Sequence, residues 1–240
     1  MAAPYKSWTV LPHGELTEVD DNILTVVGEI RMAVGMLPRR MTIVRLSDRR
    51  LVIFSAIALK EDEMRRIGDY GTPAFLLVPN AIHRLDAKIW KDRYPAIKVI
   101  TPKGARSKVQ EIVPVESSSG DFGDPDVLFI SVPGTLENES ALQINGTNGI
   151  TLVLNDLVGN IRNSTGLSGW FLRMMKFAGD EPHIPKPVKW KLVSNKSELR
   201  EQLLKWAALP RLKRILVSHG SIIDDNPGAV LRGLAASLAQ

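Results

Sequence analysis

The chain contains 240 residues, of which 44% are hydrophobic and 24% charged, so it can bury a substantial core. It has no cysteine, which excludes disulfide bonds, thiolate metal sites and a cysteine nucleophile. The net charge is a mild +5, the first residues lack the apolar stretch of a signal peptide, and no apolar run approaches the ~18 residues of a membrane span. We therefore expect a cytoplasmic protein without a membrane partner.

The first half of the chain has the pattern of a partly parallel sheet covered by helices. Runs of β-branched residues predict strands, and the tight turn at 47–50 joins two of them into a hairpin. Helical spacing follows twice, ending at Gly68 and before Pro95. The expected strands are 22–27, 41–46, 51–56, 74–79 and 97–101, and the expected helices are 59–67 and 86–94.

The second half begins after a polar connection, 116–126, whose Ser, Gly, Asp and Pro residues do not suit a core. A hairpin is expected at Asn145-Gly146, Ser197 is expected to cap a helix, and Asn226 with Pro227 to open the last one. The expected strands are 127–132, 141–144, 150–154 and 215–217, and the expected helices run from Ser197 to about residue 208 and over 227–238.

Both halves run from strands into helix and strand, so the expected fold class is α/β, with two mixed sheets packed face to face and helices outside. We expect one domain, 1–240, with two halves at about 19–115 and 127–240. The segment 160–191 departs from this pattern because it is long and rich in Gly and Pro. It is expected to be an irregular insertion or lid carrying Trp170, Met174 and His183, or else to place a short helix, 168–177, on the core.

Three apolar runs lead to residues that can bind a metal. The run 74–79 leads through Asn80 to His83, 151–154 leads to Asp156, and 215–217 leads to His219. Strands of α/β folds commonly deliver functional side chains at the rim of the sheet. Two imidazoles and one carboxylate are a suitable set for one Zn²⁺ or Fe²⁺ ion.

The chain resembles the metallo-β-lactamase superfamily, through the order of its elements and through four short stretches. Residues 77–101 are similar to the first metal loop of that family with its following helix and strand, and His83 falls at the closing His of the H-x-H-x-D-H motif. The stretches 132–135, 152–156 and 218–220 are similar to the Pro-Gly-His-Thr loop, the strand before the bridging Asp, and the final His-Gly pair. The resemblance implies a four-layer αββα sandwich with a metal site at the sheet edges.

The metal motif is degenerate in this chain. At the family's three-histidine positions stand Val78, Asn80 and Thr135, which implies that this metal is absent. Ile82 replaces the Asp ligand of the other site, and Ser55-Ala56 stands where the family has Asp-x-Gly. The narrower resemblance is to a bacterial branch that carries a P-N-x-x-H loop and a final His-Gly.

The resemblance implies a single-metal hydrolase for a small or anionic substrate. His83, Asp156 and His219 would hold the ion, Asp156 and His219 would be catalytic, and Asn80 and Thr135 would contact a ligand or the substrate. The alternative is a metal-free binding or assembly module of the same fold, in which Asp156 and His219 bond each other and His83 caps a helix or turn. The long segment could also form a homodimer contact. Nucleic-acid binding is disfavoured because the basic clusters are short and dispersed.

Overall fold

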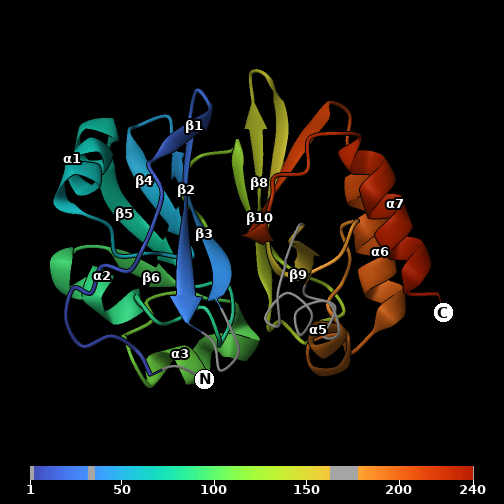
Figure 1. The fold of residues 1–240 in the computed structure, drawn as a ribbon, viewed down its shortest axis with the longest axis horizontal. Coiled ribbons are helices and arrows are strands. Elements are labelled where there is room, and N and C mark those ends of the chain that lie inside the picture. Colours follow the sequence, from blue (N-terminus) through green and yellow to red (C-terminus); the bar gives the residue numbers. More distant parts are fainter. Residues whose placement is uncertain (1–2, 32–35, 163–177, 240) are drawn as a thin grey trace.

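The computed structural model describes residues 3–31, 36–162 and 178–239, which fold into two sheets packed face to face between two layers of helices (Figure 1). The predicted four-layer αββα sandwich is confirmed. Each sheet is formed by one half of the chain, because the described strands of the first sheet precede residue 101 and those of the second follow residue 126.

The first sheet has six strands in the sequential order β1-β2-β3-β4-β5-β6. The first four strands are antiparallel, and β4, β5 and β6 are parallel because helices connect them. The hairpin predicted at 47–50 is the connection between β3 and β4. The strands are β1 (Thr17–Asp20), β2 (Ile23–Arg31), β3 (Met36–Arg45), β4 (Arg50–Phe54), β5 (Thr72–Leu77) and β6 (Lys98–Ile100).

The second sheet has four strands in the order β10-β9-β8-β7. The pairs β7–β8 and β8–β9 are antiparallel, whereas β9 and β10 are parallel and are joined through the helices of the outer layer. The predicted hairpin is the β8–β9 connection, but Asn145 and Gly146 are the last residues of β8, and Thr147 and Asn148 form the turn. The strands are β7 (Val127–Ser131), β8 (Ser140–Gly146), β9 (Gly149–Asn160) and β10 (Leu212–Gly220).

Helices cover the outer face of each sheet. Beside the first sheet lie α1 (Glu61–Tyr70), α2 (Ala87–Arg93), the 3₁₀ turn η1 (Lys103–Ala105) and α3 (Arg106–Gln110); beside the second lie α5 (Lys186–Lys191), α6 (Lys196–Ala207) and α7 (Pro227–Ser237) (Figure 1). Trp90 of α2 and Trp206 of α6 are buried in these outer layers. A third buried cluster joins the two sheets and includes Phe54 of the first sheet and Leu142 of the second. Burial on both faces explains why the central strands are almost continuously apolar.

The helix starts show where local prediction succeeded and where it failed. Helix α7 begins at Pro227 as predicted, with Asn226 as its cap. The prediction that Ser197 caps α6 was wrong: the Asn195 side chain accepts hydrogen bonds from the backbone N–H groups of Ser197 and Glu198. Helix α5 lies within the segment 160–191 that was expected to be irregular, and the expected helix 168–177 lies outside the described residues.

Candidate metal centre

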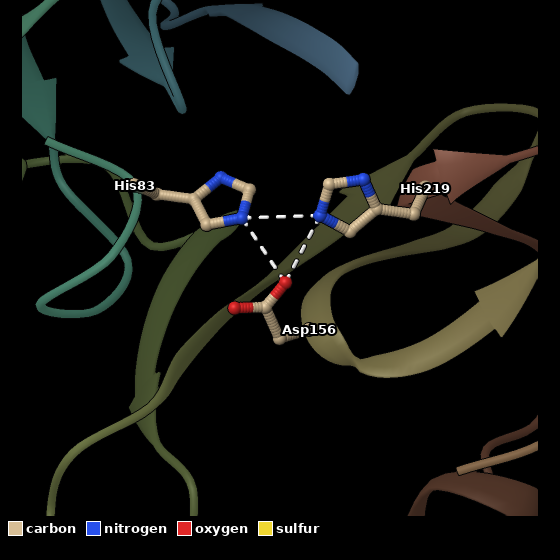
Figure 2. Close-up of side chains that lie close together, drawn as sticks. All are labelled: His83, Asp156 and His219. Carbon is tan, nitrogen blue, oxygen red and sulfur yellow. Dashed lines mark hydrogen bonds and ion pairs between the residues drawn. The ribbon is translucent and has the colours of Figure 1, made fainter. Parts of the chain in front are cut away.

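Three polar side chains from distant parts of the chain meet near the carboxyl ends of β5 and β10 (Figure 2). His83 comes from the loop between β5 and α2, Asp156 from β9 and His219 from β10. These are the three residues to which the apolar runs of the sequence lead. Folding therefore brings together the predicted ligand set.

The position of Asp156 depends on an irregularity in β9. Val217 of β10 pairs with Leu154, but His219, only two residues later, pairs with Gly159. The four residues 155–158 therefore lie opposite Ser218 alone, and the strand bulges where Asp156 meets His219. The sequence predicts a strand that stops before Asp156, whereas β9 continues to Asn160.

The three functional groups form a small triangle. Nε2 of His83 and Nε2 of His219 each lie 3.0 Å from Oδ1 of Asp156, and the two nitrogen atoms lie 3.2 Å apart. All three residues are largely shielded, with side-chain exposures of 9% for His83, 10% for Asp156 and 6% for His219. Their interaction therefore takes place mostly away from bulk water.

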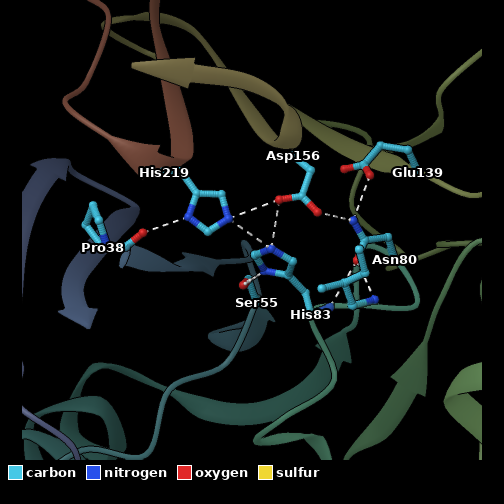
Figure 3. A network of polar contacts seen from close by, with 8 residues as sticks. Pro38, Ser55, Asn80, His83, Glu139, Asp156 and His219 are labelled. Carbon is cyan, nitrogen blue, oxygen red and sulfur yellow. Dashed lines mark hydrogen bonds and ion pairs between the residues drawn. The ribbon is translucent and has the colours of Figure 1, made fainter. Parts of the chain in front are cut away.

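The other ring nitrogen of each histidine has its own partner. Nδ1 of His219 donates a hydrogen bond to the carbonyl oxygen of Pro38 at 2.7 Å, and Nδ1 of His83 lies 2.8 Å from Oγ of Ser55 (Figure 3). A carbonyl oxygen can only accept, so Nδ1 of His219 carries a proton and a neutral ring presents a lone pair at Nε2. This is the arrangement that orients an imidazole toward a metal ion.

The triangle fits a divalent metal ion. Tetrahedral ligands held about 2.0–2.2 Å from zinc are separated by roughly 3.3–3.6 Å, only slightly more than the three distances in this structure. In a neutral His219 ring, Nε2 presents a lone pair toward Oδ1 of Asp156, which is also an acceptor, so no proton on that ring satisfies their 3.0 Å contact. One cation between them would remove this conflict, so the donor set fits zinc or iron.

The charges of the three groups are interdependent. Burial raises the pKa of Asp156, but the two imidazoles lower it by more, so the pKa of this carboxyl lies well below its usual range. Burial lowers the pKa of His219, but its contact with the Asp156 carboxylate outweighs burial and raises the pKa above its usual value. The Asp156 carboxylate and the His219 imidazole therefore favour a positive charge between them.

Asn80 connects the triangle to a second buried carboxyl group (Figure 3). Its Nδ2 donates to Oδ2 of Asp156 at 2.7 Å and to Oε2 of Glu139 at 2.9 Å, while its Oδ1 accepts from the backbone N–H groups of Ile82 and His83. Glu139 has no exposed surface, and burial, with the neighbouring Asp156 charge, raises its pKa well above the usual value. Asn80 thus fixes both Asp156 and the loop that carries His83.

Ser55 and Glu139 are site residues that the sequence analysis did not identify as such. Ser55 was noted only as a departure from the Asp-x-Gly position and was placed inside the predicted strand 51–56, whereas β4 ends at Phe54 and Ser55 follows it. Its φ of 56° is rare for a serine, and its side chain contacts His83 from a buried position. No local sequence signal distinguishes Glu139, which follows an exposed loop.

Among the described residues, the converging donor atoms do not include those of the other predicted site residues. The Thr135 hydroxyl donates to the carbonyl oxygen of Val132 at 2.7 Å, and Val78 belongs to the core beneath the first helical layer. His183 lies with Nδ1 2.8 Å from the carbonyl oxygen of Glu181, and its backbone pairs with Gly159 of β9. Trp170 and Met174 lie outside the described residues.

Solved structures with a similar fold are metallo-β-lactamases. The DIM-1 enzyme superposes with a TM-score of 0.64 at 11% identity, covering 95% of this chain and 99% of its own. The FIM-1 enzyme from Pseudomonas aeruginosa, in its mono-zinc form, has a TM-score of 0.63 at 12% identity, covering 95% and 96%. The enzyme from Hirschia baltica has a TM-score of 0.60 at 10% identity, covering 92% and 97%. The chain has the metallo-β-lactamase fold.

The metallo-β-lactamase fold is shared over nearly the whole length, but sequence comparison gives no closer assignment. No protein-family model matches the chain, and no curated protein matches it in sequence. In the described part of the chain, no helix is both long and apolar enough to cross a membrane. At identities this low, the structural likeness establishes the fold and leaves the activity to be argued from the site.

Proposed function

We propose that this chain binds one divalent metal ion, zinc or iron, through His83, Asp156 and His219, and that it is a hydrolase for a small or anionic substrate. The observation that carries the proposal is the triangle of donor atoms, 3.0, 3.0 and 3.2 Å apart, whose imidazoles are each anchored at Nδ1. Hydrogen bonds that fix the second ring nitrogen of each ligand histidine are typical of metal sites in proteins.

The donor set supports one ion. Val78, Asn80 and Thr135 stand where the related fold would need imidazoles, and Asn80 uses its amide N–H groups to bond two carboxyl groups. The side of Asp156 that faces Asn80 is therefore occupied by a hydrogen-bond donor. The FIM-1 structure, described in its mono-zinc form, is of a protein with this fold holding one zinc.

A bound ion of this kind supplies Lewis-acid chemistry and lowers the pKa of water to ~7. The chain's own residues provide the setting. Asp156 presents Oδ1 to the two imidazoles while Asn80 holds its Oδ2, so this carboxylate can bind the ion or orient the reacting water. His219 keeps Nε2 directed inward because Pro38 holds Nδ1. Shielding of all three side chains strengthens their electrostatic interactions.

Metal analysis of natively purified protein tests the proposal. We expect close to one ion per chain, and a rise in melting temperature when Zn²⁺, Mn²⁺ or Fe²⁺ is added after chelation. His219→Ala should abolish both results, whereas His13→Ala, which changes a partly buried histidine outside the triangle, should preserve them. Metal-dependent turnover of a panel of β-lactam, ester, thioester and phosphodiester substrates, lost in His219→Ala, would support the hydrolase.

The alternative is a metal-free binding or assembly module. It is supported by the same contacts, because a protonated His219 can donate to Asp156 from Nε2 while Nδ1 donates to Pro38, which braces three segments without an ion. Natively purified protein free of metal, with no response to added ions, would favour the module over the hydrolase. Bound metal without turnover of any substrate would retain the site and reject the hydrolytic role.

A further inference from the structure

A surface on the second helical layer combines exposed cations with an exposed tryptophan. The residues 182–197 contain four lysines and no aspartate or glutamate, although the whole chain has a net charge of only +5. Lys186, Lys191, Lys196 and Arg200 are exposed, and Trp190 is 80% exposed, more than any other large hydrophobic side chain in the described residues. We call these five residues the cationic surface.

The four cations of this surface differ from several others in how they are paired. Within residues 3–31, 36–162 and 178–239, none of the four forms an ion pair with a carboxylate. Several cations beside the first sheet are paired with carboxylates instead: Arg66 with Glu63, Lys88 with Asp92, Arg93 with Glu61, and Lys108 with Glu111. The four cations are therefore free of ion pairs in the described structure, although Glu198 and Glu201 lie near them on α6, and unpaired surface cations attract an anionic partner.

The tryptophan is held in place by its helix. Val188 of α5 is buried, and the Nζ atom of Lys189 donates to the backbone carbonyl of Ser237 at the end of α7. Lys186 and Trp190 are four residues apart, so they lie on one side of α5, away from Val188. The link 192–195 is short, so Lys196 at the start of α6 stays within about 17 Å of Lys191 along the chain.

We propose that the cationic surface docks on an anionic lipid membrane. Tryptophan settles at the boundary between headgroups and acyl chains, and lysine side chains reach acidic headgroups around it. A single-stranded nucleic acid would require several stacking aromatics along a groove, whereas Trp190 is the one aromatic among the large exposed hydrophobics of the described chain. Peripheral docking needs no membrane-spanning helix, so it is compatible with the absence of one from the described residues. This proposal differs from the expectation, drawn from the sequence, that the protein has no membrane partner.

Co-sedimentation of the full chain with vesicles tests this docking. We expect binding to phosphatidylcholine vesicles that contain phosphatidylserine, no binding to phosphatidylcholine alone, and weaker binding as NaCl rises from about 0.1 M to about 0.5 M. The double variant Lys186→Gln/Lys191→Gln should weaken binding by more than about tenfold, and Trp190→Ala by several-fold. Circular dichroism should show that both remain folded.

A matched control removes the same charge elsewhere. Lys60 and Lys98 are exposed, belong to the first half of the chain and form no ion pair in the described structure, so Lys60→Gln/Lys98→Gln should keep vesicle binding within about twofold. Equal losses in both double variants would overturn the proposal by showing a general charge effect. Failure to bind the vesicles, or binding of single-stranded oligonucleotides in their place, would overturn it as well.

Discussion

The carbonyl oxygen of Pro38, on β3 of the first sheet, accepts a hydrogen bond at 2.7 Å from Nδ1 of His219, on β10 of the second. Two residues further along β3, Arg40 donates from Nε to the carbonyl of Val217 at 3.1 Å and from Nη2 to that of Gly220 at 2.8 Å. Strand β3 thus holds the segment of β10 on both sides of His219. The candidate site therefore depends on how the two sheets are joined.

Arg40 should support both stability and metal binding. Burial lowers its pKa to about 10, and its described partners are two carbonyl groups and the Thr25 hydroxyl rather than a carboxylate. Arg40→Met should lower the free energy of unfolding by about 2–4 kcal/mol, because two carbonyls lose their donor. It should also weaken zinc binding about tenfold by loosening His219. Denaturation in urea and calorimetric titration with zinc measure the two effects.

The exposed Arg65, paired with Asp62, provides the control for Arg40. Arg65→Met should change stability by less than about 1 kcal/mol and leave zinc affinity unchanged. Unaltered zinc affinity in Arg40→Met would show that His219 does not need this support.

Ser55→Ala tests the anchor of the other imidazole. Removing Oγ frees Nδ1 of His83, so the ring should lose its fixed orientation and zinc affinity should fall about tenfold. Cobalt substituted for zinc would report the change, since the visible spectrum of bound cobalt depends on the geometry of its ligands. Ser107→Ala on exposed α3 is the control, and an identical spectrum in both variants would reject the orienting role.

Asn80→Ala tests the connection between Asp156 and Glu139. The substitution removes the donor for both carboxyl groups and the acceptor for the backbone N–H groups of Ile82 and His83. We expect a loss of about 2–4 kcal/mol in unfolding free energy, because the groups left behind are buried. Asn138→Ala, at a partly exposed loop, should cost less than about 1 kcal/mol by the same denaturation measurement. Equal costs would contradict the assigned role of Asn80.

The buried ion pair between Asp20 and Arg214 should make stability depend on acidity. Their atoms lie 2.5 Å apart, and Asn148 also donates to Asp20. Burial raises the pKa of Asp20, but these hydrogen bonds and the Arg214 charge lower it by more, so the folded pKa lies below the usual value. A lowered carboxyl pKa stabilises the folded state above the unfolded pKa, and this stability is lost as the pH falls through the folded pKa.

Asp20→Asn should therefore cost about 3 kcal/mol at neutral pH, and the difference from the parent protein should shrink below about pH 4. Urea denaturation across a pH series measures this difference. Asp62→Asn, which alters an exposed pair, should show a cost below about 1 kcal/mol at every pH. A difference for Asp20→Asn that stayed constant into strong acid would exclude a lowered pKa.

The sequence by itself determined the succession of strands and helices, the αββα class and the three donor residues, because hydrophobic periodicity and the ends of apolar runs are local properties of the chain. It could not identify the anchors of the site. Pro38 and His219 are 181 residues apart, and no local sequence pattern indicates that the carbonyl of Pro38 will accept a hydrogen bond from the His219 ring. The bulge at 155–158, the Asn80–Glu139 contact and the exposure of Trp190 likewise depend on how the sheets and helices pack, since register and burial are set by neighbours distant in sequence.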